Sequence, residues 1–146
     1  MEKDNDKSVF IIKPEAFSQR EKIKRIITTQ SNLEIVATKI VVLTEQDIDT
    51  LYLDDIGTDL MKAIKVHLIG KTVEVGVVAG KDVITELTRV CGKYPFPGDC
   101  SKDTIRGIFG KNQPAIYHGI VYYLNAIHKA SEKEAKPSLE WFYSKK

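Results

Sequence analysis

The chain has 146 residues, of which 42% are hydrophobic and 29% are charged, and its formal net charge is +2. These values are typical of one soluble globular domain, here spanning residues 1–146, that is long enough to bury a core. The small net charge argues against nucleic acid or an anionic membrane as the main partner, and the absence of an apolar run of about 18 residues argues against a membrane span.

The first third of the chain predicts two strands with a helix between them. Residues 8–13 form a short apolar run that is typical of a buried strand. Pro14 follows and fits either a turn or the first position of a helix. Residues 16–29 place their apolar side chains on one helical face, and the β-branched run 33–43 predicts a long strand.

Short elements continue through the middle of the chain. Thr44 begins a helix with a capping-box pattern, and we expect that helix to end near Tyr52. After a polar loop, residues 60–68 predict a second short helix, which Gly70 ends. Residues 72–79 then predict another strand.

The last part of the chain predicts helix, loop, strand and helix. Residues 82–91 favour a helix, and residues 93–103 favour a loop with two prolines. The apolar, aromatic stretch 115–128 has room for one or two strands. Residues 130–142 predict a final helix that Pro137 must cap or kink. This order predicts an α+β fold of the ferredoxin-like type, an antiparallel sheet covered by helices.

The two cysteines and the N-terminus bear on the compartment. Cys91 and Cys100 match neither a metal spacing nor a disulfide framework. The charged first residues precede no apolar stretch long enough for a signal peptide. We therefore expect free thiols in a cytoplasmic protein, and no metal held by the protein alone.

Several polar residues that could carry chemistry stand at the ends of the predicted elements. An imidazole can accept a phosphoryl group and pass it on, and lysine and arginine beside it favour an anionic substrate such as a phosphate. No Walker loop or kinase glycine loop occurs. Each residue also has a purely structural interpretation; for example, Arg106, which we place on a loop, could pair with Asp99 or Asp103. The candidates are Lys13, Tyr52, Arg89, Arg106, Asn125 and His128.

Four segments resemble motifs of the nucleoside diphosphate kinase family, in the family's order along the chain. Residues 10–15 resemble its strand-Lys-Pro-Asp-Gly motif, and residues 104–109 are similar to its Thr-Ile-Arg-Gly-Asp-Phe motif. Residues 125–128 resemble its Asn-x-x-His segment, and residues 139–142 resemble the Trp-Phe that closes its last helix. The fold of that family is also ferredoxin-like.

The resemblance implies transfer of the γ-phosphate from a nucleoside triphosphate to a nucleoside diphosphate. The mechanism would be ping-pong, through a phosphohistidine at His128. By the same resemblance Lys13 would contact the transferring phosphate and Tyr52 would orient nearby groups. Arg106 would bind the nucleotide phosphates, and Asn125 would hydrogen-bond the sugar.

The resemblance also implies partners and a cofactor. Mg²⁺ would bridge the phosphates with few protein ligands of its own. Leu60 stands near the place of the aromatic residue that stacks on the base, and Arg89 near the place of a phosphate-binding arginine. We expect a homo-oligomer, at least a dimer, formed through sheet or helix packing, and no nucleic-acid or membrane partner.

Some positions depart from the family pattern. Arg89 lies one residue after the family arginine, a rotation of about 100° on a helix, and Tyr94 replaces a threonine. The glutamate that orients the histidine would fall near Pro137, with Glu134 as a substitute. These departures leave open a catalytically weakened nucleotide-binding or regulatory module on the same fold. A pure protein-interaction domain is a third possibility, which would bind no nucleotide.

The sequence offers more than one histidine as the nucleophile. His118 lies at a more typical distance after Phe109 than His128 does, but Ala115 stands where an asparagine is expected before it. We therefore favour His128 and place His118 in an inserted hairpin. His67, among the apolar residues of a helix, is interpreted as structural.

Overall fold

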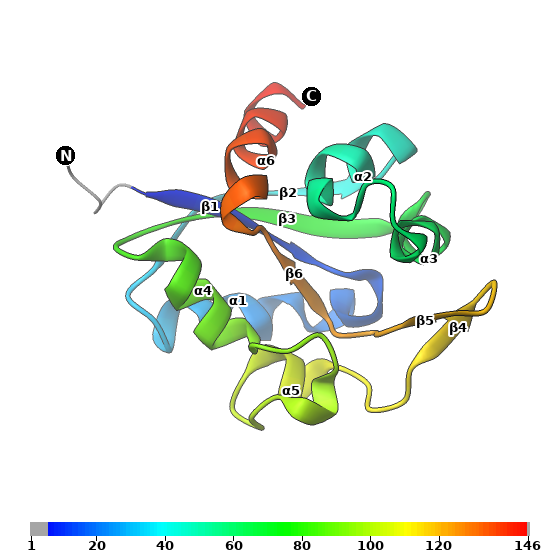
Figure 1. The fold of residues 1–146 in the computed structure, drawn as a ribbon. Helices are drawn as coiled ribbons and strands as arrows, with labels where there is room; N and C mark the ends of the chain where they lie inside the picture. Colours follow the sequence, from blue (N-terminus) through cyan, green and yellow to red (C-terminus); the bar gives the residue numbers. More distant parts are fainter. Residues whose placement is uncertain (1–5, 146) are drawn as a thin grey trace.

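The computed structural model describes residues 6–145. It has a four-stranded antiparallel sheet with helices on both faces (Figure 1). The strands lie in the order β2-β3-β1-β6. Their bounds are β1 (Lys7–Ile12), β2 (Glu34–Val42), β3 (Thr72–Ala79) and β6 (Ile127–Lys129). This arrangement confirms the predicted ferredoxin-like α+β fold.

Burial on both faces explains why β1 is apolar without alternation. Val9 and Ile11 point into one hydrophobic cluster, and Phe10 and Ile12 point into a second cluster on the other face of the sheet. A strand that is covered on both sides needs apolar residues at every position. β1 is one of the two inner strands, and its C-terminal end leads directly into the site described below.

One face of the sheet carries α1 (Arg20–Thr29) and α4 (Val83–Cys91), with α5 (Ile105–Phe109) beside them (Figure 1). The predicted helix 16–29 is divided, because a 3-10 turn over Pro14–Gln19 precedes α1 and has Pro14 at its first position. The five-residue helix α5 replaces the loop that was predicted around Arg106. It is too short to show helical periodicity in the sequence, but the Thr104 side chain caps it by accepting a hydrogen bond from the Gly107 N–H.

The other face carries α2 (Glu45–Leu51), α3 (Asp59–Leu68) and α6 (Glu132–Ser144) (Figure 1). The capping box predicted at Thr44 is confirmed, and Ser131 forms a second one at the start of α6. Pro137 lies inside α6 rather than at its cap. Within the described residues, no helix is long and apolar enough to span a membrane.

Three short strands begin within the stretch 115–128, which corrects the prediction of one or two; the third, β6, runs on to Lys129. Two of them, β4 (Ala115–Tyr117) and β5 (Ile120–Tyr122), form a separate hairpin that packs against α3. His118 and Gly119 form its turn with φ of 52° and 78°, as a two-residue type I′ turn requires. The predicted hairpin around His118 is therefore confirmed, and the third strand, β6, belongs to the main sheet.

Candidate active site

A cleft of about 380 Å³ opens between the C-terminal end of β1, β6 and the helices beside them. Of the seven residues predicted for the site, six line this cleft although they come from different elements. They are Lys13, Tyr52, Leu60, Arg106, Asn125 and His128. The fold thus brings together residues that are far apart in the sequence.

His128 lies in the middle of β6, paired with Ile11 of β1. Its ring stacks on Tyr52 with centroids 3.9 Å apart. Its Nε2 lies 3.2 Å from the carbonyl oxygen of Leu51 and 3.3 Å from Oε1 of Glu134. Both neighbours are acceptors, so Nε2 carries the proton and Nδ1 keeps its lone pair. No side chain or carbonyl of residues 6–145 forms a hydrogen bond with Nδ1.

Glu134 is a buried carboxylate that the fold holds in place from several sides. Its Oε1 accepts from the Ser131 N–H at 3.2 Å, and its Oε2 accepts from the Asp54 N–H at 2.9 Å. Burial alone would raise the pKa of Glu134, but the hydrogen bond from His128, with these two backbone donors, lowers it overall. Glu134 therefore occupies the position next to the histidine for which the family spacing suggested Pro137.

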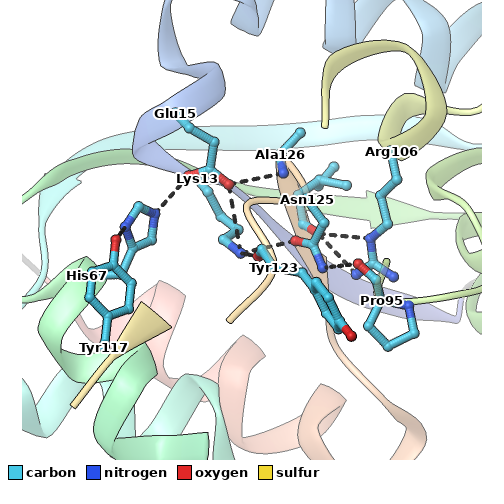
Figure 2. A network of polar contacts seen from close by, with 10 residues as sticks. Lys13, Glu15, His67, Pro95, Arg106, Tyr117, Tyr123, Asn125 and Ala126 are labelled. Carbon is cyan, nitrogen blue, oxygen red and sulfur yellow. Dashed lines mark hydrogen bonds and ion pairs between the residues drawn. The ribbon is translucent and has the colours of Figure 1, made fainter. Parts of the chain in front are cut away.

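Lys13 follows β1 and is 3% exposed. Its Nζ donates hydrogen bonds to Oδ1 of Asn125 at 2.9 Å and to the carbonyl oxygen of Tyr123 at 3.2 Å (Figure 2). It also lies 4.5 Å from the ring centroid of Tyr122. Burial, with the positive charge of Arg106, lowers the pKa of Lys13 to about 8 despite the opposing charge of Glu15.

Arg106 points its guanidinium group at carbonyl oxygens rather than at a carboxylate. It donates to Ile127 at 2.9 and 3.2 Å, to Tyr94 at 3.2 Å and to Gly92 at 3.3 Å. Pairing with Asp99 or Asp103 is not observed. Because carbonyl groups are neutral, the charge of Arg106 is left to act on an anion in the cleft.

Asn125 and Leu60 complete the predicted set. Asn125 accepts from Lys13 and donates from Nδ2 to the carbonyl oxygen of Pro95 at 3.0 Å, so its amide is oriented at both ends. Leu60, near the start of α3, is 40% exposed and gives the cleft an apolar wall.

Arg89 is the one predicted site residue that does not line the cleft. It is exposed on α4, where it pairs with Glu86 at 3.0 Å and donates to the Gln30 carbonyl oxygen at 2.7 Å. The shift of one residue along the helix turns the side chain toward the end of α1. Tyr94, in the place of the family threonine, is 47% exposed, and its carbonyl oxygen accepts a hydrogen bond from Arg106.

The cleft also contains residues that the sequence analysis did not select. Lys93 and Lys129 add positive charge to that of Lys13 and Arg106, while Asp54, Asp55 and Glu134 add negative charge. Tyr122 and Tyr123 enter from the hairpin side. Adjacency to His128 could have identified Lys129, whereas nothing in the local sequence marks the two tyrosines.

Comparisons with known proteins agree on one family. A family model of nucleoside diphosphate kinases matches residues 6–146. A nucleoside diphosphate kinase of Campylobacter lari is 30% identical over 143 residues, covering 96% of both chains. One from Glaesserella parasuis serovar 5 is 27% identical over 137 residues, covering 92% of this chain and 91% of the relative.

Solved structures of nucleoside diphosphate kinases share the fold of this chain. The nucleoside diphosphate kinase of Aquifex aeolicus superposes with a TM-score of 0.77 at 19% identity over 96% of both chains. That of Borrelia burgdorferi, solved as a transition-state mimic with bound vanadate and ADP, superposes with a TM-score of 0.73 at 25% identity. It covers 92% of this chain and 84% of the Borrelia chain.

Proposed function

Because the chain belongs to the nucleoside diphosphate kinase family, we propose that His128 carries the phosphoryl group in a ping-pong transfer between nucleotides. The observation that carries this proposal is the state of the His128 ring. Leu51 and Glu134 hold the Nε2 proton, so the lone pair of Nδ1 is available to a phosphate in a cleft that Lys13 and Arg106 also line.

In the first half-reaction, Nδ1 of His128 attacks the γ-phosphorus of a nucleoside triphosphate in line. The N–P bond forms as the bond to the bridging oxygen breaks, and the nucleoside diphosphate leaves with that electron pair. The ring becomes a phosphoimidazolium that keeps its Nε2 proton, and the charge of Glu134 stabilises it. A second nucleoside diphosphate then reverses these steps and takes the phosphoryl group.

The remaining cleft residues bind and position the nucleotide. Lys13 and Arg106 neutralise the transferring and adjacent phosphates, which is the main work in this kind of reaction. The Tyr52 ring fixes the plane of the imidazole. Asn125 keeps a second lone pair and a second N–H for a ribose hydroxyl. Leu60 offers an apolar surface that does not distinguish one base from another.

Mg²⁺ would enter this cleft bound to the phosphates of the nucleotide. Among residues 6–145, no group of three or more His, Cys, Asp or Glu side chains could hold a metal ion without a nucleotide. Asp54 and Asp55 face the cleft and are the carboxylates that would hold a phosphate-bound ion. When bound, Mg²⁺ would neutralise phosphate charge.

The edge of the sheet supports assembly into at least a dimer. β2 is an edge strand, and three of its apolar side chains, Val36, Ile40 and Val42, are between 44% and 55% exposed. An unpaired edge with apolar side chains is suited to pairing with a second copy. Light scattering of the intact chain and of Ile40→Lys would test this, since only the intact chain should associate.

One observation favours the alternative of a weakened nucleotide-binding module. Arg89 points away from the cleft, so one positive charge of the family site is missing here. Such a module would bind nucleotide but transfer phosphate poorly, and thermal shift with nucleotide would still show binding.

Labelling decides between these functions. The chain is incubated with γ-labelled ATP and its intact mass is measured at alkaline pH, together with His128→Ala and His118→Ala. One acid-labile phosphate that disappears only in His128→Ala is expected. Loss only in His118→Ala would move the nucleophile to the hairpin turn. No label on a chain that binds nucleotide would favour the weakened module.

A further inference from the structure

Glu15 is a buried carboxylate with three partners behind the cleft (Figure 2). Its Oε1 accepts a hydrogen bond from Nε2 of His67 at 2.7 Å. Its Oε2 accepts from the Ala126 N–H at 3.0 Å and lies 3.7 Å from Nζ of Lys13. Burial would raise the pKa of Glu15, but the hydrogen bond with His67 and the charge of Lys13 lower it to about 2, so the group is anionic.

The turn before His128 depends on this carboxylate. Ala126 has a φ of 77°, a left-handed conformation that a residue with a Cβ atom rarely adopts. Its N–H is held by Glu15, and its carbonyl oxygen accepts from the Lys13 N–H at 2.9 Å. The segment around Glu15 therefore fixes the backbone that carries Asn125 and leads to His128.

Lys13 is poised between Glu15 and the cleft. An ammonium group has three donors, and Nζ uses two of them on Asn125 and Tyr123. At 3.7 Å, Glu15 is beyond hydrogen-bonding distance from Nζ. The third donor of Lys13 is thus available to a ligand as long as Glu15 finds its hydrogen bonds elsewhere.

His67 is the side chain that supplies Glu15 with that other hydrogen bond. It is 8% exposed on α3, and it does not line the cleft. Its Nδ1 lies 3.4 Å from the Tyr117 hydroxyl, and its ring lies 5.1 Å from that of Tyr122, so the hairpin holds it in place. Without His67, one oxygen of a buried carboxylate would be unsatisfied, and Lys13 is the nearest cation that could move toward it.

We propose that His67 is a positioning residue for phosphoryl transfer. By binding Glu15 it keeps Lys13 directed into the cleft and keeps the Ala126 turn in the conformation that presents His128. This inference deepens the proposed function and rests on it. His67 acts through Glu15, without contact to the nucleotide.

The test compares two replacements of His67 in the full-length chain. His67→Leu removes the hydrogen bond to Glu15. His67→Gln retains a donor at about the position of Nε2. The rate of phosphohistidine formation at saturating ATP and the dissociation constant of ADP are measured for each variant, with the melting temperature alongside. Lys62→Leu introduces the same side chain at an exposed position of the same helix and is the matched control.

We expect His67→Leu to slow phosphohistidine formation about tenfold or more, because a small displacement of a charged group is costly in a transition state. The dissociation constant of ADP should change less than about threefold, since the other cleft residues remain. His67→Gln should recover most of the rate. Lys62→Leu should behave like the unmutated chain.

Two results would overturn the inference. One is a His67→Leu variant with the unmutated rate. The other is an equal loss of rate in the leucine and glutamine variants, which would indicate packing alone. If His67→Leu does not fold, His67→Asn takes its place, because its amide is one methylene too short to reach Glu15. An unmutated chain that takes no label would instead refute the proposed function, and it is measured in the same experiment.

Discussion

Oε1 of Glu134 lies 3.3 Å from Nε2 of His128, and the same oxygen accepts the backbone N–H that closes the capping box of α6. The carboxylate that accepts the hydrogen bond of the nucleophile therefore also belongs to the capping box in which Ser131 is the N-cap. The Ser131 N–H at the start of α6 and the imidazole of His128 share this one oxygen of Glu134. The position of the helix start is therefore coupled to the orientation of His128.

Replacing Glu134 should affect catalysis more than binding. In Glu134→Gln the charge that stabilises the phosphoimidazolium is lost. We expect phosphohistidine formation to slow about 10- to 100-fold, the equivalent of one hydrogen bond to a charged group. Rapid-quench labelling measures this rate. Glu132→Gln, an exposed residue of the same helix, is the control, and an equal effect in both variants would contradict the assigned role.

Lys13 should give the reaction an alkaline limit. Its pKa is lowered to about 8 by burial, so kcat/KM should fall as pH rises through that value, when the ammonium loses its proton. Lys13→Arg, which stays charged, should be slower but show no such fall. A flat profile up to about pH 10 for the unmutated chain would contradict this assignment.

The lowered pKa of Lys13 also predicts how the free energy of unfolding changes with pH. Its pKa is about 8 in the folded chain and 10.5 as the ordinary value. Between these two values the unfolded chain binds more protons, so this group makes the free energy of unfolding increase with pH in that window. Lys13→Met should remove that increase in urea titrations. A slope that persists in the variant would assign the effect to other groups.

Arg106 should contribute to both stability and substrate binding. Arg106→Lys removes most of the hydrogen bonds to Ile127, Tyr94 and Gly92 while keeping a charge. We expect the free energy of unfolding to fall by about 1–3 kcal/mol, together with a higher KM for ATP. Urea denaturation and steady-state kinetics measure the two effects. A variant with unchanged stability would show that these carbonyl contacts are not needed.

Asp47 should contribute to stability alone. It accepts hydrogen bonds from the Thr44 N–H and from the Trp141 indole, and it pairs with Lys145, so it connects α2 with α6. Asp47→Ala should lower the free energy of unfolding by about 1–3 kcal/mol and leave kcat nearly unchanged. Asp49→Ala, which breaks a more exposed ion pair with Lys65, should cost less than about 1 kcal/mol.

The fold could be predicted where periodicity is strong. The strand 72–79 was predicted with the bounds of β3, because a β-branched run between two glycines allows little else. Two short elements, α5 and β6, could not be predicted. α5 has five residues, and β6 has three, too few to show a period in sequence.

The candidate site could be predicted to the extent that motifs mark it. Six of the seven predicted residues line the cleft, while Arg89 does not, since one residue of helical offset changes its neighbours. Glu134 could be named only as a substitute, because its approach to His128 depends on the start of α6. The contact between Glu15 and His67 spans 52 positions, and nothing local links a charged residue after a proline with a histidine among apolar side chains.

The register of β6 limits where this chain can change in length. His128 pairs with Ile11, and Ile127 pairs with Ile12, immediately before Lys13. Because side chains alternate between the two faces of a sheet, one residue inserted between Asn125 and His128 would turn the imidazole to the opposite face. The hairpin turn at His118 lies outside this sheet. A peptide tag or a fusion partner placed there should therefore leave the nucleophile in register. The same insertion between Asn125 and His128 should abolish phosphate labelling of the chain.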